Sequence, residues 1–369
     1  MLEWSRQRPD DGFMLGVTLR LRGPRPDPQR IAELVTARLP QVPVLAERLE
    51  GPLHQERWRA DDDFDAARHV HVLAGTTTLQ AGAELLADQP LHEGRPRWSL
   101  WLLDTDRAHE YLLAFRAHHA VQDGAAMAYT LKRLLDPHTP LAATSTTTMT
   151  EQRTSTPRHG RRRLLASADV PLPAMRAIVQ ATGASLNDIY LTALAGALRA
   201  WLPRADRDRP VSVRVPFNVR LRQERQDRGN RVGYTRLLLP VDEPKPSHRL
   251  ARVVEQTGHW PRERTRRLLD RLPHRLIWKH IAASLQPGDA LASATLLGIP
   301  TPLALDGSPV TGGSVTPPLP AGHLFSTALF LHPAGATLSF TARTEHQHVR
   351  DLPRLWENAL GDLHTAARA

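Results

Sequence analysis

Apolar runs along the chain predict a series of short strands. Residues 14–21 (MLGVTLRL), 98–104 (WSLWLLD) and 110–117 (EYLLAFRA) are β-prone and are bounded by polar or turn residues. Runs of this length and composition favour buried strands over helices. A short polar stretch separates the last two runs, so we expect them to be neighbours in one sheet.

Apolar residues at helical spacing predict helices in both halves of the chain. Asp27 and Pro28 are residue types that favour the N-cap and the first position of a helix. Ser185 and Asp188 fit a relaxed capping box, S-x-x-D, before the strongest helical pattern, which Pro203 ends. The apolar faces consist of Ile31, Leu34, Val35 and Leu39 in the first helix and Leu191, Leu194, Ala195 and Leu198 in the second.

A Ser/Thr-rich stretch without periodicity divides the pattern into two parts. Residues 142–157 (AATSTTTMTEQRTSTP) have the composition of a linker. Strand signals follow it at 211–217 and 234–241, with a hairpin over 327–343 and a closing helix near 351–366. Because strands and helices mix on both sides, we predict an α/β (α+β) fold with two lobes. The predicted N-terminal lobe, linker and C-terminal lobe span residues 1–141, 142–163 and 164–369.

Composition mainly excludes classes of protein and site. The 369 residues contain no cysteine, which rules out disulfides, thiolate nucleophiles and Cys-based metal sites in this sequence. No apolar run approaches the roughly 18 residues that a membrane-spanning helix needs. The first 13 residues lack the basic and apolar regions of a signal peptide. We therefore expect a cytoplasmic protein with a packed core.

The formal net charge of +10 leaves two interpretations open. One is attraction to an anionic partner, such as a phosphorylated cofactor, an acidic carrier protein, a membrane surface or nucleic acid. The other is an arginine-rich surface without a dedicated partner, because arginines alternate with acids in stretches such as RADDDFDAAR at 59–68. The basic clusters at 161–163 and 262–267 lack the interleaved aromatic residues of a nucleic-acid binder. We expect no nucleic-acid partner.

The candidate chemistry lies at the end of the third apolar run. In AFRAHHAVQDGAAM (114–127), His118 and His119 are followed by Asp123 and Gly124. A histidine with a pKa near neutrality can take a proton from a hydroxyl or amine, and a glycine leaves room for substrate. Alternatively, the pair occurs by chance and Asp123 only caps the helix that follows. The adjacent histidines do not have the i, i+4 spacing of zinc-binding motifs such as H-E-x-x-H, so no metal is expected.

The segment HHAVQDG resembles the HHxxxDG motif of the CoA-dependent acyltransferase superfamily, which includes chloramphenicol acetyltransferase, condensation domains and wax ester synthases. Other segments narrow the resemblance to bacterial wax ester synthase/diacylglycerol acyltransferases. PLHEGRPRWSLWLL (90–103) is similar to that family's PLxxxRPxWxxxLI, and GASLNDIYLTALAGALRAWL (183–202) to its GATvNDvvLaavaGALRrwL. DFDAARHVHVL, VSVRVPFNVR, GNRVG and LLLPVDEPKPSHRL also match, so the resemblance covers nearly the whole chain.

The resemblance implies two lobes, each like chloramphenicol acetyltransferase, with a tunnel between them. It implies that His119 is the general base, that His118 orients its loop, and that Asp123 is structural. The partner of Asp123 is then an arginine of the second lobe, for which Arg220 fits best and Arg214 is the alternative. The remaining implied positions are Gly124 in the loop and Asn187 in the ND motif, with a structural or tunnel-lining role. We expect Gly229 and Asn230, in the GNRVG segment, to form a turn.

The sequence departs from the family pattern at several places. The opening LSPxDxxF segment is missing or reduced, and LGIPTP (297–302) stands where the family has SNxPGP. The next segment introduces His323 and Ser326, which we interpret either as tunnel-lining groups or as structural residues.

Three functions follow as hypotheses. The first is transfer of an acyl group from CoA or a carrier protein to an alcohol or amine in specialised metabolism, favoured by the departures. The second is wax ester or acylglycerol synthesis, and the third is a catalytically silent relative that binds a carrier protein or lipid. For the enzyme we expect no cofactor besides the acyl-CoA or acyl carrier protein donor. We also expect a monomer with at most peripheral membrane contact.

Overall fold

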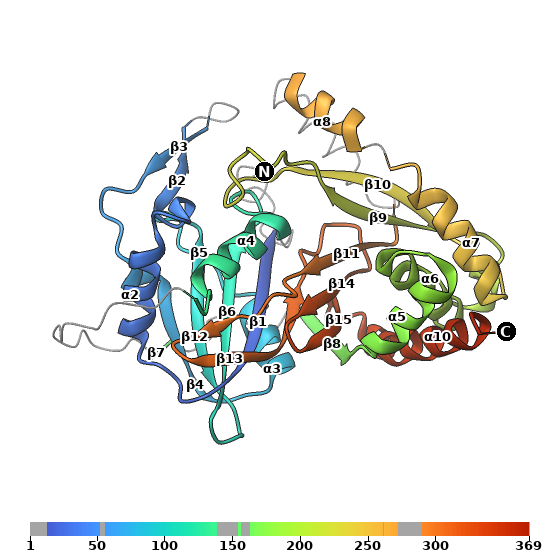
Figure 1. Ribbon diagram of the computed structural model, residues 1–369, viewed down its shortest axis with the longest axis horizontal. Helices are drawn as coiled ribbons and strands as arrows, with labels where there is room; N and C mark the ends of the chain where they lie inside the picture. Colours follow the sequence, from blue (N-terminus) through green and yellow to red (C-terminus); the bar gives the residue numbers. More distant parts are fainter. Residues whose placement is uncertain are drawn as a thin grey trace.

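The computed structural model describes residues 13–51, 56–138, 154–155, 163–260, 262–271 and 290–368. Two mixed sheets lie side by side, and each has helices packed against it (Figure 1). The predicted two-lobed α/β organisation is therefore confirmed.

The sheet of the first lobe is built around the apolar runs at the start of the chain. Its strands, in spatial order, are β12 (Ala304–Leu305), β13 (Ser308–Thr316), β1 (Met14–Arg22), β6 (Glu110–His118), β5 (Trp98–Asp104), β4 (Val70–Thr76) and β7 (Thr154–Ser155). β6 pairs antiparallel with β1 on one side and with β5 on the other, as the sequence predicts for β5 and β6. The end of β6 consequently lies deep in the lobe.

Helices cover both faces of this sheet. α2 (Pro28–Arg38) and α4 (Gly124–Leu134) contribute to a core with the inward side chains of β1 and β6, whereas α3 (Leu79–Ala87) packs against the other face. The predicted start of α2 is confirmed, because the Asp27 carboxylate accepts a hydrogen bond from the N–H of Gln29 at 2.7 Å. A separate hairpin of β2 (Glu47–Glu50) and β3 (Arg57–Ala60) extends from the lobe.

The second sheet is made of strands from the later part of the chain. In spatial order these are β10 (Val232–Leu239), β9 (Val211–Asn218), β11 (Ala292–Gly298), β14 (Phe325–His332), β15 (Gly335–Arg343) and β8 (Arg163–Asp169). β14 and β15 form the predicted hairpin. β11 lies parallel to both β9 and β14, which makes this sheet mixed as well.

The apolar face of the second sheet packs against helices. α5 (Leu172–Thr182), α6 (Leu186–Trp201), α7 (Pro246–Thr257) and α10 (Leu352–Ala366) contribute to its core. The predicted capping box of α6 is confirmed, because Ser185 and Asp188 exchange side-chain and backbone hydrogen bonds. A further helix, α8 (Arg262–Arg271), lies beside β10 at the edge of the molecule (Figure 1).

One strand from the C-terminal part of the chain belongs to the first sheet. β13 pairs antiparallel with β1, from Gly16 opposite Thr316 to Leu21 opposite Val310. The N-terminal lobe therefore contains residues 304–316, which the sequence assigned to a C-terminal lobe of residues 164–369. Local sequence hides β13, because Pro309 and two glycines interrupt the strand pattern. Gly313 is required by packing, since a Cβ there would lie 3.0 Å from Leu19 Cδ2 and Phe330 Cε1.

The predicted linker falls mostly outside the described residues. Within 142–163, the structure describes only residues 154–155, which form β7, and Arg163, which begins β8. β7 lies parallel to β4 at the edge of the first sheet. This part of the chain thus connects the two sheets.

Candidate active site

The two adjacent histidines lie where β6 ends and the chain turns toward α4. His118 is the last residue of β6 and pairs with Met14 of β1. Its backbone N–H donates to the carbonyl of Arg97 at 3.0 Å, and the N–H of His119 donates to the carbonyl of Phe13 at 2.8 Å. Neighbouring segments therefore fix the backbone of both histidines.

The His118 side chain is directed into the protein. It is 6% exposed, and its Nδ1 accepts a hydrogen bond from the N–H of Ala120 at 3.1 Å. Burial lowers its pKa to about 3, and the charge of Arg97 acts in the same direction. His118 is thus neutral at neutral pH and stabilises the turn, which supports the loop-orienting role implied by the family resemblance.

The His119 side chain is half-buried and holds a neutral imidazole at neutral pH. Burial lowers its pKa, the charge of Asp123 raises it, and the charge of Arg220 lowers it. Nδ1 lies 3.0 Å from the side-chain amide nitrogen of Asn230. With Nδ1 engaged by protein, Nε2 is the nitrogen that can exchange a proton with a substrate.

Asp123 is completely buried, and protein groups hold both of its carboxylate oxygens. Its Oδ1 accepts from the N–H of Ala126 at 3.0 Å and so caps α4, and Nη1 of Arg220 lies 2.8 Å and 2.6 Å from the two carboxylate oxygens. The N–H of Arg231 donates to Oδ2 at 2.8 Å. Among the two arginines that the family resemblance allows, the structure places Arg220, and not Arg214, against Asp123.

Arg220 also joins two loops from different lobes. Its Nη2 donates to the carbonyls of Gly229 at 2.6 Å and Arg228 at 3.1 Å. In addition, the N–H of Gly229 donates to the carbonyl of Val121 at 2.6 Å. The histidine loop and residues 228–231 consequently form one hydrogen-bonded unit.

Sequence reasoning missed the contact of Asn230 with His119. The Gly-Asn pair at 229–230 predicted a turn, and Gly229 does adopt a positive φ of 80°. The turn places the Asn230 side chain against a residue 111 positions earlier in the chain. Local sequence contains no signal for such a contact, although the GNRVG resemblance marked the segment.

Two other predicted positions make none of the hydrogen bonds of this network. Gly124 is the first residue of α4, and a Cβ there would meet only Leu297 Cδ1, at 3.4 Å. Asn187 lies in the first turn of α6 in the second lobe, where its neighbour Asp188 forms the capping box and accepts from the Thr257 hydroxyl at 2.7 Å. A tunnel-lining role for Asn187 stays a prediction.

His323 and Ser326 lie in the second lobe. The Ser293 hydroxyl is 2.9 Å from Nδ1 of His323, and burial, with the charge of Arg214, lowers the pKa of His323 to about 4. Ser326 is opposite Ser293 in the β11–β14 pair, and its hydroxyl is fully buried without a hydrogen-bond partner among the described residues. None of the described contacts joins these groups to His119, so their tunnel-lining role stays a prediction.

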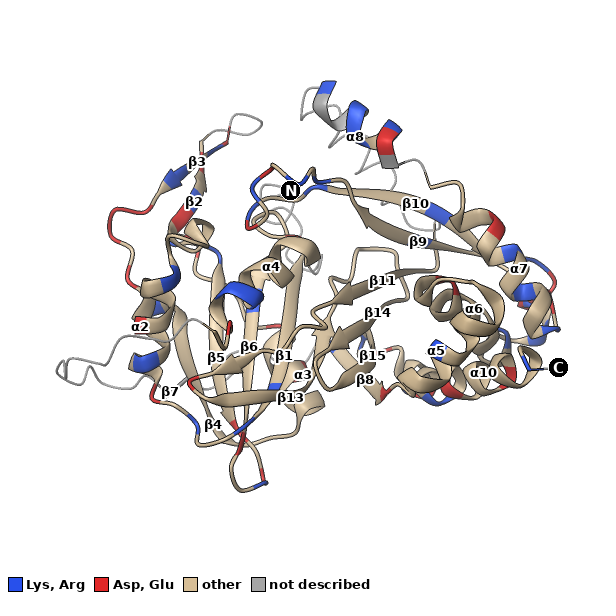
Figure 2. Cartoon of the chain, viewed as in Figure 1, with Lys and Arg blue, Asp and Glu red and all other residues tan. Residues whose placement is uncertain are grey.

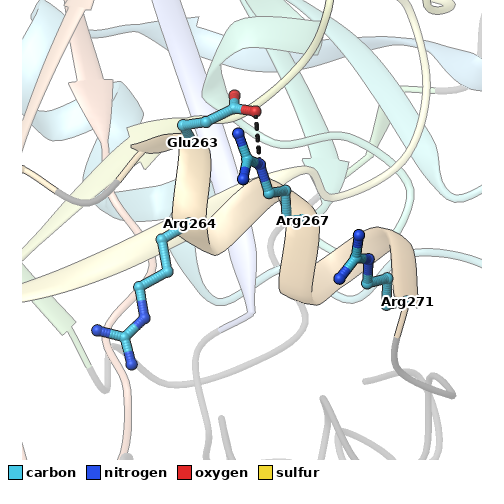
Figure 3. A pocket seen from close by; sticks show the side chains of 4 residues that line it. All are labelled: Glu263, Arg264, Arg267 and Arg271. Carbon is cyan, nitrogen blue, oxygen red and sulfur yellow. Dashed lines mark hydrogen bonds and ion pairs between the residues drawn. The ribbon is translucent and has the colours of Figure 1, made fainter.

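Basic side chains gather on α8. Figure 2 shows Lys and Arg interleaved with Asp and Glu on much of the chain, whereas α8 carries mainly arginines. A pocket of about 370 Å³ is lined by Arg264, Arg267, Arg271 and Glu263, which pairs with Arg267 at 3.0 Å (Figure 3). In the part of the chain that the structure describes, no helix has the length and apolar character to cross a membrane. The same residues include no group of three His, Asp or Glu side chains that could hold a metal ion.

The sequence matches a family model over most of the region that carries this network. The model for the wax ester synthase/diacylglycerol acyltransferase catalytic domain covers residues 13–240, which include His119, Asp123, Arg220 and Asn230. The chain belongs to this family. The family assignment made from the HHxxxDG motif and its neighbouring segments is therefore confirmed.

Curated relatives of this wax ester synthase/diacylglycerol acyltransferase family member occur in mycobacteria. A probable diacylglycerol O-acyltransferase, tgs1, of Mycobacterium tuberculosis is 25% identical over an alignment of 299 residues that covers 65% of this chain. A putative diacylglycerol O-acyltransferase of Mycobacterium bovis matches with the same identity and coverage. The match spans 64% of the length of these relatives, somewhat less than two thirds.

Solved structures share the fold at low sequence identity. The wax ester synthase/diacylglycerol acyltransferase of Marinobacter aquaeolei VT8 superposes with a TM-score of 0.67 and 17% identity, covering 97% of this chain and 95% of that one. The first condensation domain of the calcium-dependent antibiotic synthetase gives a TM-score of 0.67 and 18% identity, covering 100% of this chain and 94% of that one. These similarities establish the fold.

Proposed function

We propose that this family member is an acyltransferase that moves an acyl group from a thioester to an alcohol or amine, with His119 as general base. The observation that carries the proposal is the environment of His119. Its imidazole is neutral because burial lowers its pKa, and it is half-buried at the junction of the two lobes. The protein contacts it at Nδ1, which leaves Nε2 as the nitrogen available to a substrate.

The reaction needs one proton to move twice. The acceptor hydroxyl or amine gives its proton to Nε2 of His119 as its oxygen or nitrogen attacks the thioester carbonyl carbon. The tetrahedral intermediate then collapses, the carbon–sulfur bond breaks, and the leaving thiolate takes the proton from the imidazolium. General-base assistance of this kind contributes about 10²–10⁴-fold, and holding both substrates in one site contributes further.

The donor in this proposal is acyl-CoA or an acidic acyl carrier protein. α8 supports an anionic donor, since Arg264, Arg267 and Arg271 line one pocket. One solved relative, the starter condensation domain of rhizomide synthetase, is described in complex with C8-CoA. The residues of the proposed site all come from one chain, so we propose a monomer that requires no further cofactor.

For the acceptor, the family favours an alcohol, as in wax ester or acylglycerol synthesis. The mycobacterial relatives carry names of diacylglycerol O-acyltransferases. A second candidate is an acyltransferase of specialised metabolism, which one observation favours. Leu297 stands at the first position of the family's SNxPGP motif and lies next to Gly124. Replacement of the family's Ser–Asn pair by Leu297 and Gly298 removes two polar side chains from this place.

The test is thiol release from acyl-CoAs of increasing chain length and from the same acyl groups on an acyl carrier protein, with and without a mixed set of alcohols and amines. Wild type, His119→Ala and the control His71→Ala are compared, with products identified by mass spectrometry. His71 is a half-buried histidine of β4 whose ring is tilted against that of Trp101, with the ring centroids 4.7 Å apart. We expect acceptor-dependent release and an ester or amide product in wild type and His71→Ala, both lost in His119→Ala.

Other outcomes decide between the remaining hypotheses. Release only from carrier-bound acyl groups assigns the donor to a carrier protein. Release without a new product, still dependent on His119, indicates hydrolysis instead of transfer. Absence of release from both CoA and carrier thioesters overturns the proposal and leaves a silent binding protein.

A further inference from the structure

We propose that Asn230 is a positioning residue that fixes the tautomer and orientation of His119, and that Asp123 acts on His119 through the loop that carries Asn230. This inference rests on the proposed function. The placement of the proton on His119 can nevertheless be measured without any substrate.

The residues on both sides of Asn230 are anchored to the histidine loop. On one side, the carbonyl of Gly229 accepts from Arg220 at 2.6 Å, and its N–H donates to Val121 at 2.6 Å. On the other side, the N–H of Arg231 donates to Asp123 at 2.8 Å. Asn230 therefore has little freedom to move away from the imidazole 3.0 Å from its amide.

The orientation of the amide decides whether His119 can act as a base. If the amide nitrogen donates to Nδ1, the proton of the neutral ring lies on Nε2, which then cannot accept one. If the amide is turned by 180°, its oxygen accepts a hydrogen bond from Nδ1–H. Nε2 then carries no proton and keeps the lone pair that a base needs. Because the proposed base needs a free lone pair on Nε2, we assign the amide oxygen of Asn230 to Nδ1, which is the reverse of the orientation that brings the amide nitrogen within 3.0 Å of it.

An amide suits this position better than a carboxylate would. The negative charge of Asp123 is already compensated by the guanidinium of Arg220, whose Nη1 lies 2.6 Å from Oδ2 of Asp123. A neutral amide fixes the ring without adding a second negative charge that would raise the pKa of His119. Asp123 thus contributes mainly by holding the Asn230 loop in place.

The experiment compares Asn230→Leu, Asn230→Asp and wild type, with Asn358→Leu and Asn358→Asp as matched controls. Asn358 is an exposed residue of α10 on the second lobe. We expect Asn230→Leu to lower kcat at least about 10-fold with KM for acyl-CoA and the melting temperature little changed. Asn230→Asp should retain more activity and move the acidic limb of the pH profile to higher pH, because a carboxylate stabilises the imidazolium.

A spectroscopic measurement separates this proposal from the proposed function. In protein labelled with ¹⁵N-histidine, the His119 signals are assigned by their loss in His119→Ala. We expect wild type to carry its proton on Nδ1 and Asn230→Leu to populate both tautomers. A wild-type proton on Nε2, or an unchanged tautomer in Asn230→Leu, overturns the role of Asn230 even if acyl transfer is found. An unchanged kcat in Asn230→Leu would also overturn the positioning role of Asn230.

Discussion

Asp123 and Arg220 form an ion pair with a closest distance of 2.6 Å, and their side chains are 0% and 1% exposed. The pair joins the histidine loop of the first lobe to a loop of the second, 97 residues later. Both groups have further partners, since Asp123 caps α4 and Arg220 binds two backbone carbonyls. Nε of Arg220 is buried without a hydrogen-bond partner among the described residues. A buried pair of this kind fixes geometry more than it adds stability.

Removal of one partner should therefore be costly. We expect Arg220→Ala to lower the free energy of unfolding by about 3–5 kcal/mol, because it leaves a buried carboxylate without its counter-ion. The measurement is urea unfolding, with Arg222→Ala as the control, since Arg222 is exposed two positions later. Arg220→Lys should recover only part of the lost stability. The lysine ammonium lacks the planar, forked donors with which the guanidinium contacts the carboxylate and both carbonyls at once. Equal stability of Arg220→Ala and Arg222→Ala would contradict the structure.

The sequence predicted the parts of the fold that depend on local pattern. β1, β5 and β6 follow from apolar runs, and α2 and α6 begin at the predicted caps. β13 was not predicted, because its glycines serve contacts made only in the folded protein. Gly313 leaves space for Leu19 and Phe330, which come from opposite lobes.

The candidate site likewise contains one contact that the sequence predicted and one that it did not. The family pattern predicted the pairing of Asp123 with a second-lobe arginine and left Arg220 and Arg214 as the two candidates; the structure places Arg220 there. Asn230 was interpreted as part of a turn because the local signal of a Gly-Asn pair concerns backbone conformation alone. Its contact with His119 depends on how the lobes meet, and no spacing in a single sequence encodes that distance.

Activity should depend on a histidine with a pKa below its usual value. Because burial lowers the pKa of His119, the unprotonated base persists into mildly acidic solution. We expect the acidic limb of kcat/KM for acyl-CoA to be centred below pH 6.5. The check is a rate profile from pH 4.5 to 8 at constant ionic strength. An acidic limb centred above pH 6.5 would show that the charge of Asp123 outweighs burial.

Acid should also reduce stability. The pKa values of His118 and His323 are lowered by burial to about 3 and about 4, whereas an unfolded histidine titrates near 6.5. Below pH 6.5 the unfolded chain binds protons that the folded chain does not, so the free energy of unfolding falls as the pH decreases toward 4. Each such histidine contributes up to about 1.4 kcal/mol per pH unit.

The slope of this decline can be assigned to a single residue. Urea unfolding at intervals between pH 7 and pH 4 gives the free energy for wild type and His323→Gln. The variant removes one titrating group and should show a shallower decline over this range. His348→Gln is the control, since His348 is exposed. Identical slopes for wild type and His323→Gln would mean that His323 titrates normally in the folded protein.

Gly124 should be needed for activity more than for folding. A Cβ at this position would lie 3.4 Å from Leu297 Cδ1 and within 4 Å of no other group outside its chain neighbours, so a small displacement of the leucine accommodates alanine. We expect Gly124→Ala to change stability by less than about 1 kcal/mol while lowering kcat/KM for bulky acceptors. Adding Leu297→Ala should recover part of that loss by restoring space. A large fall in melting temperature for Gly124→Ala would instead assign the glycine a structural role.

The arginines of α8 should act on the donor through charge. α8 packs near Gly233, since a Cβ there would lie 2.8 Å from Thr265 Cγ2, and Gly233 is three residues after Asn230. Arg264→Glu with Arg271→Glu should therefore raise KM for acyl-CoA by about 3- to 10-fold at low ionic strength, with kcat unchanged.

Two comparisons make this prediction specific. At about 0.5 M salt the difference should largely disappear, because the screening length falls to a few ångströms. An acyl-pantetheine donor, which lacks the nucleotide phosphates, should not distinguish the variant from wild type. The charge-matched control is Arg204→Glu with Arg209→Glu, at exposed positions after α6. If the control raises KM as much as the α8 variant, the effect belongs to the overall charge of +10 and α8 has no particular part in donor binding.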